Sequence, residues 1–311
     1  MRDQGIDVAL CSEWDPQIGQ IRFRIHNDNA VLFTSFEEYE AEVENGSHIY
    51  TEYAFLSSPC VDYARGGSRA GPNGSSGHYF MRSIKAAVKA GCKVIIVENS
   101  CGILDFEVWS EAAEYLRSES FYVHQATQRP DHVVDASPVE PTTRNRAFIV
   151  GLKANAAADP ENFRWPAQPL GTVDFELLPP MRPHLLPAGD IPHACTYPIE
   201  EFERFPTPRR REDGALVLGF LRRHPVLSPD GPCATLRAQV AKAKPPGSVT
   251  GLLFDGVQVR NLLVPEALSI MGYPRNMLDD VPEDLGYLLV GNSVPRYLLS
   301  RIVKAAKDVM M

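Results

Sequence analysis

The sequence lacks the marks of a secreted, membrane-bound or metal-binding protein. Its apolar runs are only a few residues long, and the N-terminal stretch MRDQGIDVALCSEWD has no basic segment followed by a hydrophobic one. We therefore expect neither a signal peptide nor a membrane span, and we expect a cytoplasmic location. Internal repeats and low-complexity tracts are absent as well.

The six cysteines form no pattern that predicts a shared role. They are scattered without Cys-x-x-Cys pairs and without histidines at zinc-ligand spacing, so we expect no metal site. A reducing compartment also argues against disulfide bonds. The cysteines are Cys11, Cys60, Cys92, Cys101, Cys195 and Cys233.

The formal net charge of −8 gives no general attraction to nucleic acid, but the charge is unevenly spread. Between residues 204 and 244, nine Lys or Arg stand against three acidic residues, a local excess of six positive charges. This segment fits a surface that faces phosphates. It also fits an ordinary solvated face that offsets the acidic N-terminal part.

The first 155 residues alternate short apolar runs with helical patterns, which is typical of a sheet built from β-α-β units. The helices are expected at 16–27, 78–91 and 107–118, with Pro16 at the first start and Gly91 at the second end. The strands are expected at 8–12, 30–33, 53–57, 93–97 and 147–152.

Proline marks a second region. Sixteen of the 26 prolines lie between residues 156 and 250, where helical periodicity is weak. We expect an α/β catalytic domain from residues 1–155 plus 280–311, and a small irregular or β domain with its return segment from 156–279. Residues 295–309 recover an amphipathic helical pattern.

Three of the expected strands run into chemically reactive residues. In an open parallel sheet, catalytic groups gather beyond the carboxyl ends of the strands. An acid followed by an indole suits a nucleoside, whose ribose hydroxyls and base they contact. A cysteine near a glutamate suits addition of a thiol to an electron-poor ring. The strand ends are Glu13-Trp14-Asp15, Pro59-Cys60 and Glu98-Asn99.

Each of these residues also has a purely structural interpretation. A cysteine after a strand is often a small core residue, and an acid at a strand end is often a helix cap. Arg144 and Arg146 fit surface charges on an edge strand as well.

Five motifs in order carry a resemblance to the C5-cytosine DNA methyltransferases. The resemblance runs from about residue 5 to about residue 308 and leaves out the Pro-rich region, and it implies a Rossmann-like methyltransferase sheet with a target-recognition domain. The motifs are SPCVDYARGG, VENSCGIL, TTRNRAFIVGL, RNLLVPEALSIMGYP and VGNSVP.

The resemblance implies a covalent mechanism. Cys60 would add to C6 of a cytosine that has left the DNA duplex, and C5 would then attack the methyl group of S-adenosylmethionine. Glu98 would hydrogen-bond N3 and the exocyclic amine, with Asn99 holding that turn. Arg146, and less directly Arg144, would orient the base, and a nearby arginine would favour the thiolate.

The resemblance also assigns the cofactor site. Glu13 and Trp14 match the residues that bind ribose and adenine, while Pro59 and the Asn292-Ser293 turn would line the methionine part. Thr34 and Ser35 stand where the family has an aspartate that contacts adenine.

The resemblance further implies a DNA duplex as partner. The segment 64–77 has five glycines and is expected to be a mobile loop that closes over the base. The arginines expected to contact DNA are Arg65 and Arg69 in this loop, and Arg209, Arg210, Arg211, Arg222, Arg223 and Arg237 in the Pro-rich region.

The chain departs from the family pattern in several places. Val61 replaces a glutamine, Ala64 a serine and Thr142 another glutamine. The first strand and its Gly-rich turn are missing, so we expect either an active DNA methyltransferase completed by a second polypeptide or a truncated one. The alternative is a non-catalytic DNA- or protein-binding relative, and an RNA cytosine methyltransferase is a further variant.

Overall fold

The structure is a computed structural model of the chain. It describes residues 4–26, 30–46, 51–133, 138–167, 178–191, 196–197, 200, 202–212, 214–221, 224–236 and 252–310. The chain divides into two compact units. Unit 1 comprises Met1–Gln128, Asn145–Pro166 and Ser300–Met311, and unit 2 comprises Arg129–Arg144 and Ala167–Leu299.

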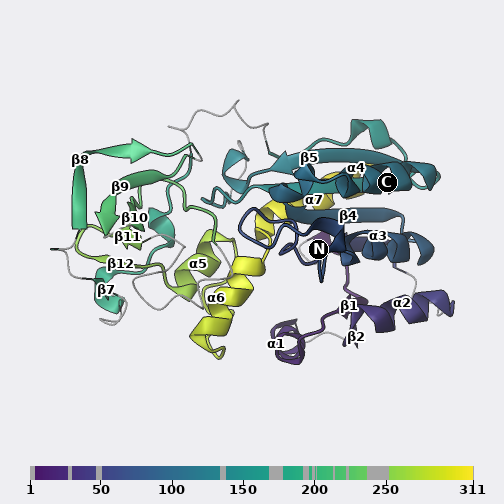
Figure 1. Ribbon diagram of the computed structural model, residues 1–311, viewed down its shortest axis with the longest axis horizontal. Helices are drawn as coiled ribbons and strands as arrows, with labels where there is room; N and C mark the ends of the chain where they lie inside the picture. The colour runs from purple at the N-terminus through teal and green to yellow at the C-terminus, as the bar shows by residue number, and fades with distance from the viewer. Residues whose placement is uncertain are drawn as a thin grey trace. The chain divides into compact units, whose positions relative to one another are not determined.

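Unit 1 begins with a small parallel sheet, coloured purple in Figure 1. β1 (Leu10–Ser12) pairs with β2 (Val31–Phe33), and α1 (Pro16–His26) connects them. Pro16 is the first residue of α1, where its fixed φ angle suits a helix start. α2 (Phe36–Glu44) follows β2.

A four-stranded mixed sheet is the larger part of unit 1. Its order is β3 (Tyr53–Leu56), β4 (Val94–Ser100), β6 (Arg146–Lys153) and β5 (Phe121–Gln128). β3 runs parallel to β4, whereas β6 is antiparallel to both of its neighbours. α3 (Tyr79–Lys89) and α4 (Val108–Ser118) precede and follow β4, and short 3-10 turns lie at η2 (Gly71–Asn73), η3 (Cys101–Asp105) and η5 (Pro160–Asn162).

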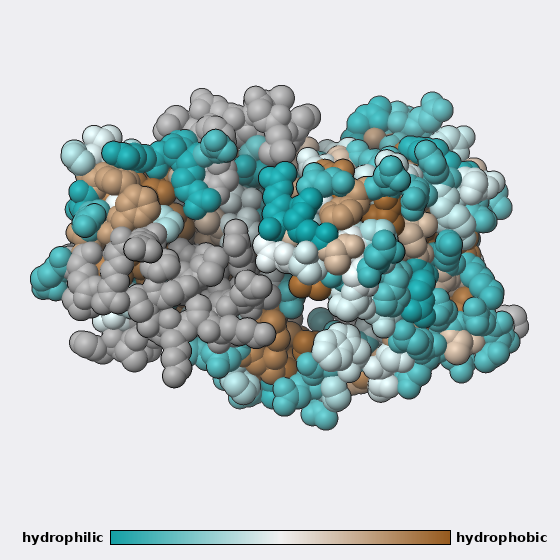
Figure 2. Space-filling view, viewed as in Figure 1, coloured by the Kyte–Doolittle hydropathy of each residue, from teal (hydrophilic) through white to brown (hydrophobic). Residues whose placement is uncertain are grey.

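The core of unit 1 forms around β4. Val94, Ile95, Ile96 and Val97 are all buried, as expected for a strand covered on both faces. Apolar residues of α3 and α4 pack into the same cluster at helical spacing, among them Phe80, Ile84, Ala112 and Leu116. On the face shown in Figure 2, hydrophobic surface around the elements of unit 1 is broken into small areas among hydrophilic residues.

The expected α/β class is confirmed, and the strand pairing adds two features that the sequence pattern did not predict. β1 and β2 form a sheet of their own, and β6 runs antiparallel inside the other. The pattern also missed α2 and β5. In β5 the apolar Phe121, Tyr122, Val123 and Ala126 do not alternate regularly with polar residues, so the strand period is obscured.

Unit 2 contains a six-stranded sheet within and after the Pro-rich region. Its order is β7 (Thr196–Tyr197), β12 (Val259–Asn261), β11 (Leu252–Phe254), β10 (His224–Leu227), β9 (Leu216–Leu221) and β8 (Phe202–Arg210). The helices are α5 (Val264–Ile270) and α6 (Glu283–Asn292), with 3-10 turns η4 (Pro130–His132), η7 (Arg182–His184) and η8 (Ala188–Asp190).

The two units have other bounds than the expected domains, since residues 129–144 and 280–299 belong to unit 2 and residues 156–166 to unit 1. Glu140 shows the physical reason. Its buried carboxylate accepts hydrogen bonds from the backbone N–H groups of Tyr297 and Leu298, in the first turn of α7 (Arg296–Asp308). The assignment of catalytic and target-recognition roles to the expected domains stays a prediction.

A buried ion pair braces unit 2. The guanidinium of Arg260 donates to both carboxylate oxygens of Glu266, at 2.8 and 2.7 Å, and also to Asp255 at 2.9 Å. Glu266 in turn accepts from the backbone N–H groups of Leu263 and Leu186. The cluster therefore joins β12, the start of α5 and the segment after η7.

We predict that Glu266→Gln lowers the free energy of unfolding by about 3 kcal/mol, since it leaves a buried guanidinium without its main counter-charge. Chemical denaturation of the full chain measures this. Asp308→Asn is the matched control, because the Lys304–Asp308 pair is exposed, and it should change stability by less than about 0.5 kcal/mol. Equal effects of the two substitutions would contradict a bracing role for Glu266.

Candidate active site

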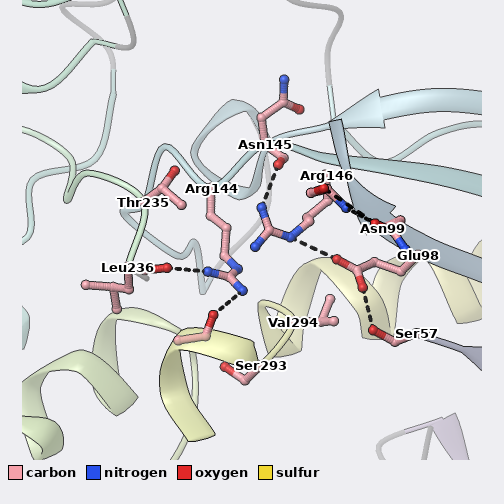
Figure 3. Close-up of polar contacts among 12 residues, drawn as sticks. Ser57, Glu98, Asn99, Arg144, Asn145, Arg146, Thr235, Leu236, Ser293 and Val294 are labelled. Atoms are coloured by element: carbon pink, nitrogen blue, oxygen red, sulfur yellow. Dashed lines mark hydrogen bonds and ion pairs between the residues drawn. The ribbon is translucent and has the colours of Figure 1, made fainter. Parts of the chain in front are cut away.

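A carboxylate at the end of β4 is held from two sides. Glu98 is only 5% exposed. One of its oxygens lies 2.9 Å from Nε of Arg146, and the other accepts the hydroxyl of Ser57 at 2.6 Å. Figure 3 shows both contacts, with the guanidinium and the serine on opposite sides of the carboxylate. Both oxygens of Glu98 therefore have a fixed donor.

The strand register explains why Arg146 reaches Glu98. β4 and β6 are antiparallel, with Ser100 opposite Arg146 and Glu98 opposite Phe148. Glu98 and Ser100 lie on the same face of β4, since side chains alternate along a strand. Arg146 is therefore the diagonal neighbour of Glu98, a separation that a long side chain spans. Arg146 also donates to the carbonyl of Asn145.

Asn99, the residue after Glu98, is hydrogen-bonded to the segment that leads to Cys60. The amide of Asn99 donates to the carbonyl of Ser58 at 3.3 Å and lies 3.4 Å from its hydroxyl. Together with the Ser57–Glu98 bond, this attaches both serines before Pro59 to the end of β4. Asn99 thus contacts the turn that it is expected to hold, and its part in catalysis stays a prediction.

Cys60 forms no disulfide bond among the described residues and is half-buried, so it is neither enclosed in the core nor fully exposed. Its carbonyl accepts the backbone N–H groups of Tyr63 and Ala64, at 2.9 and 2.7 Å. The chain therefore turns directly after the nucleophile candidate. Pro59, expected to line the cofactor site, is exposed in the same turn.

The two arginines of the loop after Cys60 differ in their contacts. Arg65 is exposed. Arg69 forms an ion pair with Asp105 at 2.9 Å, and its guanidinium lies over the ring of Phe106. Arg69 would have to leave these contacts to bind a phosphate. Burial raises the pKa of the nearby Cys101 thiol to about 11, against the lowering effect of Arg146 and Arg65, so Cys101 is a poor nucleophile at neutral pH.

Arg144 has different contacts from Arg146. It is buried in unit 2 and donates to the carbonyls of Leu236 and Gly291, at 2.6 and 2.7 Å. Figure 3 shows these bonds as well. Arg144 thus holds backbone groups in unit 2, and its expected role in orienting the base stays a prediction.

Besides Pro59, the expected cofactor residues of unit 1 follow β1 and β2 directly. The indole of Trp14 is 74% exposed, which is unusual for tryptophan and leaves a face open for stacking. One oxygen of Glu13 accepts the backbone N–H of Asp15. The two residues offer a carboxylate and an open aromatic face, and their expected contact with the ribose and adenine of a cofactor stays a prediction.

Thr34 and Ser35 are used in a helix cap. The Ser35 hydroxyl accepts the backbone N–H of Glu38, and the Glu38 carboxylate accepts from the backbone and hydroxyl of Thr34. This arrangement caps the N-terminus of α2. Cofactor contact by these two residues stays a prediction.

In unit 2, Asn292 is the last residue of α6 and is exposed, and Ser293 caps the helix through a bond to the carbonyl of Val290. The expected turn before the final helix is present. Its contact with a cofactor stays a prediction.

Among the arginines expected to contact DNA in unit 2, Arg209 and Arg211 are exposed. The guanidinium of Arg209 lies 4.1 Å from the centre of the Phe205 ring, and Arg210 donates to the carbonyl of Gly214. Arg222, Arg223 and Arg237 lie outside the described residues.

Sequence reasoning missed two residues close to Cys60 in the chain: Ser57, which precedes it, and Asp62, which follows it. Ser57 bonds Glu98, and Asp62 is a buried carboxylate bonded within the following loop. Their closeness to Cys60 was the only signal in the sequence. The residue types gave no further indication, because a serine or aspartate in a loop is usually a turn residue.

The described part of the chain contains neither a membrane-spanning helix nor a cluster of metal-ligating side chains. None of the helices there is long and apolar enough to cross a membrane. In the same residues, no group of three or more His, Cys, Asp or Glu side chains is arranged to hold a metal ion.

The fold is similar to that of solved methyltransferases. The prophage-encoded putative DNA modification methyltransferase from E. coli matches with a TM-score of 0.66 at 16% identity, covering 99% of this chain and 94% of that one. The Dnmt2 methyltransferase of S. pombe matches at 0.66 and 15%, covering 97% and 91%. The methyltransferase EhMeth of Entamoeba histolytica matches at 0.63 and 12%, covering 97% and 90%.

The family follows from the sequence match. The C-5 cytosine-specific DNA methylase family model matches residues 1–179, more than half of the 311-residue chain. The chain therefore belongs to this family. Comparison with curated proteins gave no match.

We predict that Ser57→Ala lowers kcat for methyl transfer about tenfold with little change in KM for the nucleic acid, since loss of the hydroxyl frees one oxygen of Glu98. Steady-state kinetics measures this. Ser57→Thr keeps the hydroxyl and should retain most of the activity. If the alanine and threonine variants were equally impaired, the hydroxyl would have no role in holding Glu98.

Proposed function

We propose that the protein transfers a methyl group from S-adenosylmethionine to C5 of a cytosine in DNA, with Cys60 as the covalent nucleophile. The observation that carries this proposal is the Glu98 carboxylate, held by Arg146 and Ser57 at the end of β4. The half-buried Cys60 follows Ser57 by three residues in a turn that Asn99 also fastens. In the proposed reaction Glu98 supplies the acid and Cys60 the thiol.

The proposed chemistry begins at the thiolate. The sulfur of Cys60 forms a bond to C6, and the electron pair of the C5=C6 double bond moves to C5, making that carbon nucleophilic. Glu98 hydrogen-bonds the N3 side of the ring as charge develops there. S-adenosylmethionine would supply the methyl group that C5 attacks, and its sulfonium sulfur would keep the electron pair of the broken S–CH3 bond and leave as the neutral thioether S-adenosylhomocysteine. Loss of the C5 proton to a base then returns an electron pair to the ring and expels the Cys60 thiolate.

Arg146 and Ser57 act on this step by orienting Glu98. An ion pair and a hydroxyl on opposite oxygens fix the plane of the carboxylate before the base arrives. Such preorganisation reduces the reorganisation required in the transition state. The same guanidinium is expected to contact the base oxygen.

The proposed cofactor site uses the exposed Trp14 ring and Glu13, with Pro59 near the reacting thiol. The proposed DNA contacts are the exposed Arg65, Arg209 and Arg211, and Arg69 after it leaves Asp105. Attack on C6 needs access to the face of the ring, so the cytosine has to leave the base stack.

We also propose that a second polypeptide completes the catalytic unit. Among the described residues, β3 pairs on one side only, with β4, and its four residues are only half-buried. A strand can be added to such an edge through backbone hydrogen bonds. The alternative, a relative that binds DNA or protein without catalysis, predicts no methylation under any conditions.

We predict that Cys60→Ser abolishes methylation, because a serine alkoxide is not accessible at neutral pH. The protein is expressed with the flanking genes of its natural locus in a host that lacks cytosine-5 methylation, and host DNA and RNA are bisulfite-sequenced. Methylated cytosines should occur in DNA and disappear with Cys60→Ser, but not with the control Cys11→Ser. Methylation confined to RNA would reject the DNA substrate, and unmodified nucleic acid would reject catalysis.

We predict that Trp14→Ala weakens S-adenosylmethionine binding about tenfold, through loss of the aromatic face on which adenine stacks. Isothermal titration calorimetry on the protein with its partner polypeptide measures this. Trp14→Phe keeps an aromatic face and should bind within a few-fold of the parent. Unchanged affinity in Trp14→Ala would remove this residue from the cofactor site.

A further inference from the structure

A buried carboxylate lies two residues after the nucleophile. Asp62 is only 2% exposed. One of its oxygens accepts the hydroxyl of Ser68 at 2.5 Å, and the other accepts the backbone N–H and hydroxyl of Ser76, at 2.8 and 2.7 Å. Residues from both arms of the loop after Cys60 therefore meet on this one side chain.

The backbone of the same loop is bonded to itself. The N–H of Ser68 donates to the carbonyl of Val61, and the N–H of Gly71 donates to the carbonyl of Asp62, each at 2.9 Å. The packing leaves no space at Gly74, because a Cβ there would lie 2.2 Å from the carboxyl carbon of Asp62. The expected mobile loop is thus packed around Asp62 as a folded segment.

The next residue ties this segment to the core. Tyr63 is fully buried, and its hydroxyl donates to the carbonyl of Gly77 at 2.7 Å. Its ring packs edge-on against the rings of Phe80 and Phe106. Because the N–H of Tyr63 also donates to the carbonyl of Cys60, the nucleophile, Asp62 and the core are connected through consecutive residues.

We infer that Asp62 is a positioning residue, which holds the loop of residues 61–77 folded and thereby fixes the turn that presents Cys60. The inference rests on the proposed function for its catalytic consequence, but its structural content does not. No sequence motif singled out Asp62, and it is not expected to touch the substrate.

The charge of Asp62 is matched to this role. Hydrogen bonds from Ser68 and Ser76 lower the pKa of the carboxyl to about 2. A lowered folded-state pKa adds stability above the unfolded value of about 3.9, and that stability is lost only as the pH falls towards 2. The loop contacts therefore persist throughout the neutral range.

The test compares Asp62→Asn with the matched control Asp105→Asn, which removes the same charge from the exposed partner of Arg69. Limited proteolysis with trypsin reports on the loop, since Arg65 and Arg69 lie in it. The rate of iodoacetamide reaction with Cys60, relative to Cys11, reports on the turn. Neither measurement needs substrate, so both hold whether or not the protein methylates DNA.

We expect cleavage after Arg65 and Arg69 to be at least about tenfold faster in Asp62→Asn than in the parent, because cleavage follows the population of the open loop. The Cys60 alkylation rate should change with it, and Asp105→Asn should stay within about threefold of the parent. Where methylation is measured, kcat should fall in Asp62→Asn with KM for the cofactor unchanged.

Ser76→Ala serves if Asp62→Asn does not fold, since it removes one hydroxyl donor and keeps the carboxylate. It should increase loop cleavage by a smaller factor. The inference would be overturned if a folded Asp62→Asn showed the same loop cleavage and Cys60 alkylation as the parent. If Asp62→Asn is unfolded, the same result in Ser76→Ala would overturn it.

Discussion

The carboxylate of Glu98 joins two segments that are otherwise far apart in the sequence. It forms an ion pair with Arg146 of β6 and accepts a hydrogen bond from Ser57, the residue after β3. These contacts hold Glu98 and the serine that leads to Cys60 together at the end of β4. A buried carboxylate with an unpaired oxygen would be costly. The two donors therefore stabilise the acid and orient it at the same time.

The support for this arrangement comes from the buried sheet below it. Most residues of β4 and β6 are buried, and the register of the two strands makes Arg146 the diagonal neighbour of Glu98. The loop after Cys60 adds a second support, because Asp62 collects hydrogen bonds from Ser68 and Ser76. Glu98 and the turn at Cys60 thus lie at the edge of a buried core, which suits a site that needs fixed geometry.

Much of unit 1 could be predicted from the sequence. Strands β1, β2, β3, β4 and β6 follow from short apolar runs, and α3 and α4 follow from apolar residues on one helical face. The proximity of Cys60's turn to Glu98 follows from two neighbouring parallel strands ending at one edge. The antiparallel direction of β6 and the separate sheet of β1 and β2 could not be predicted, because strand patterns carry no pairing information.

The remaining site residues depend on contacts that spacing does not encode. Ser57 and Asp62 acquire their roles from hydrogen bonds formed only when the loop is folded. Thr34 and Ser35 form a helix cap, which the sequence analysis could not predict because it did not predict α2. In unit 2 the prolines obscured the strand period, although β8 itself contains two of them as an edge strand of the sheet.

The most direct test is to trap the covalent step. A duplex in which the target cytosine carries fluorine at C5 cannot lose a proton there, so the sulfur–C6 bond persists after methyl transfer. Incubation of the protein, with its partner polypeptide, with this duplex and S-adenosylmethionine is followed by peptide mass spectrometry. The account predicts a nucleotide adduct on the peptide that contains Cys60. An adduct on another cysteine such as Cys101, or methyl transfer to an unmodified duplex with no adduct on the fluorinated one, would contradict it.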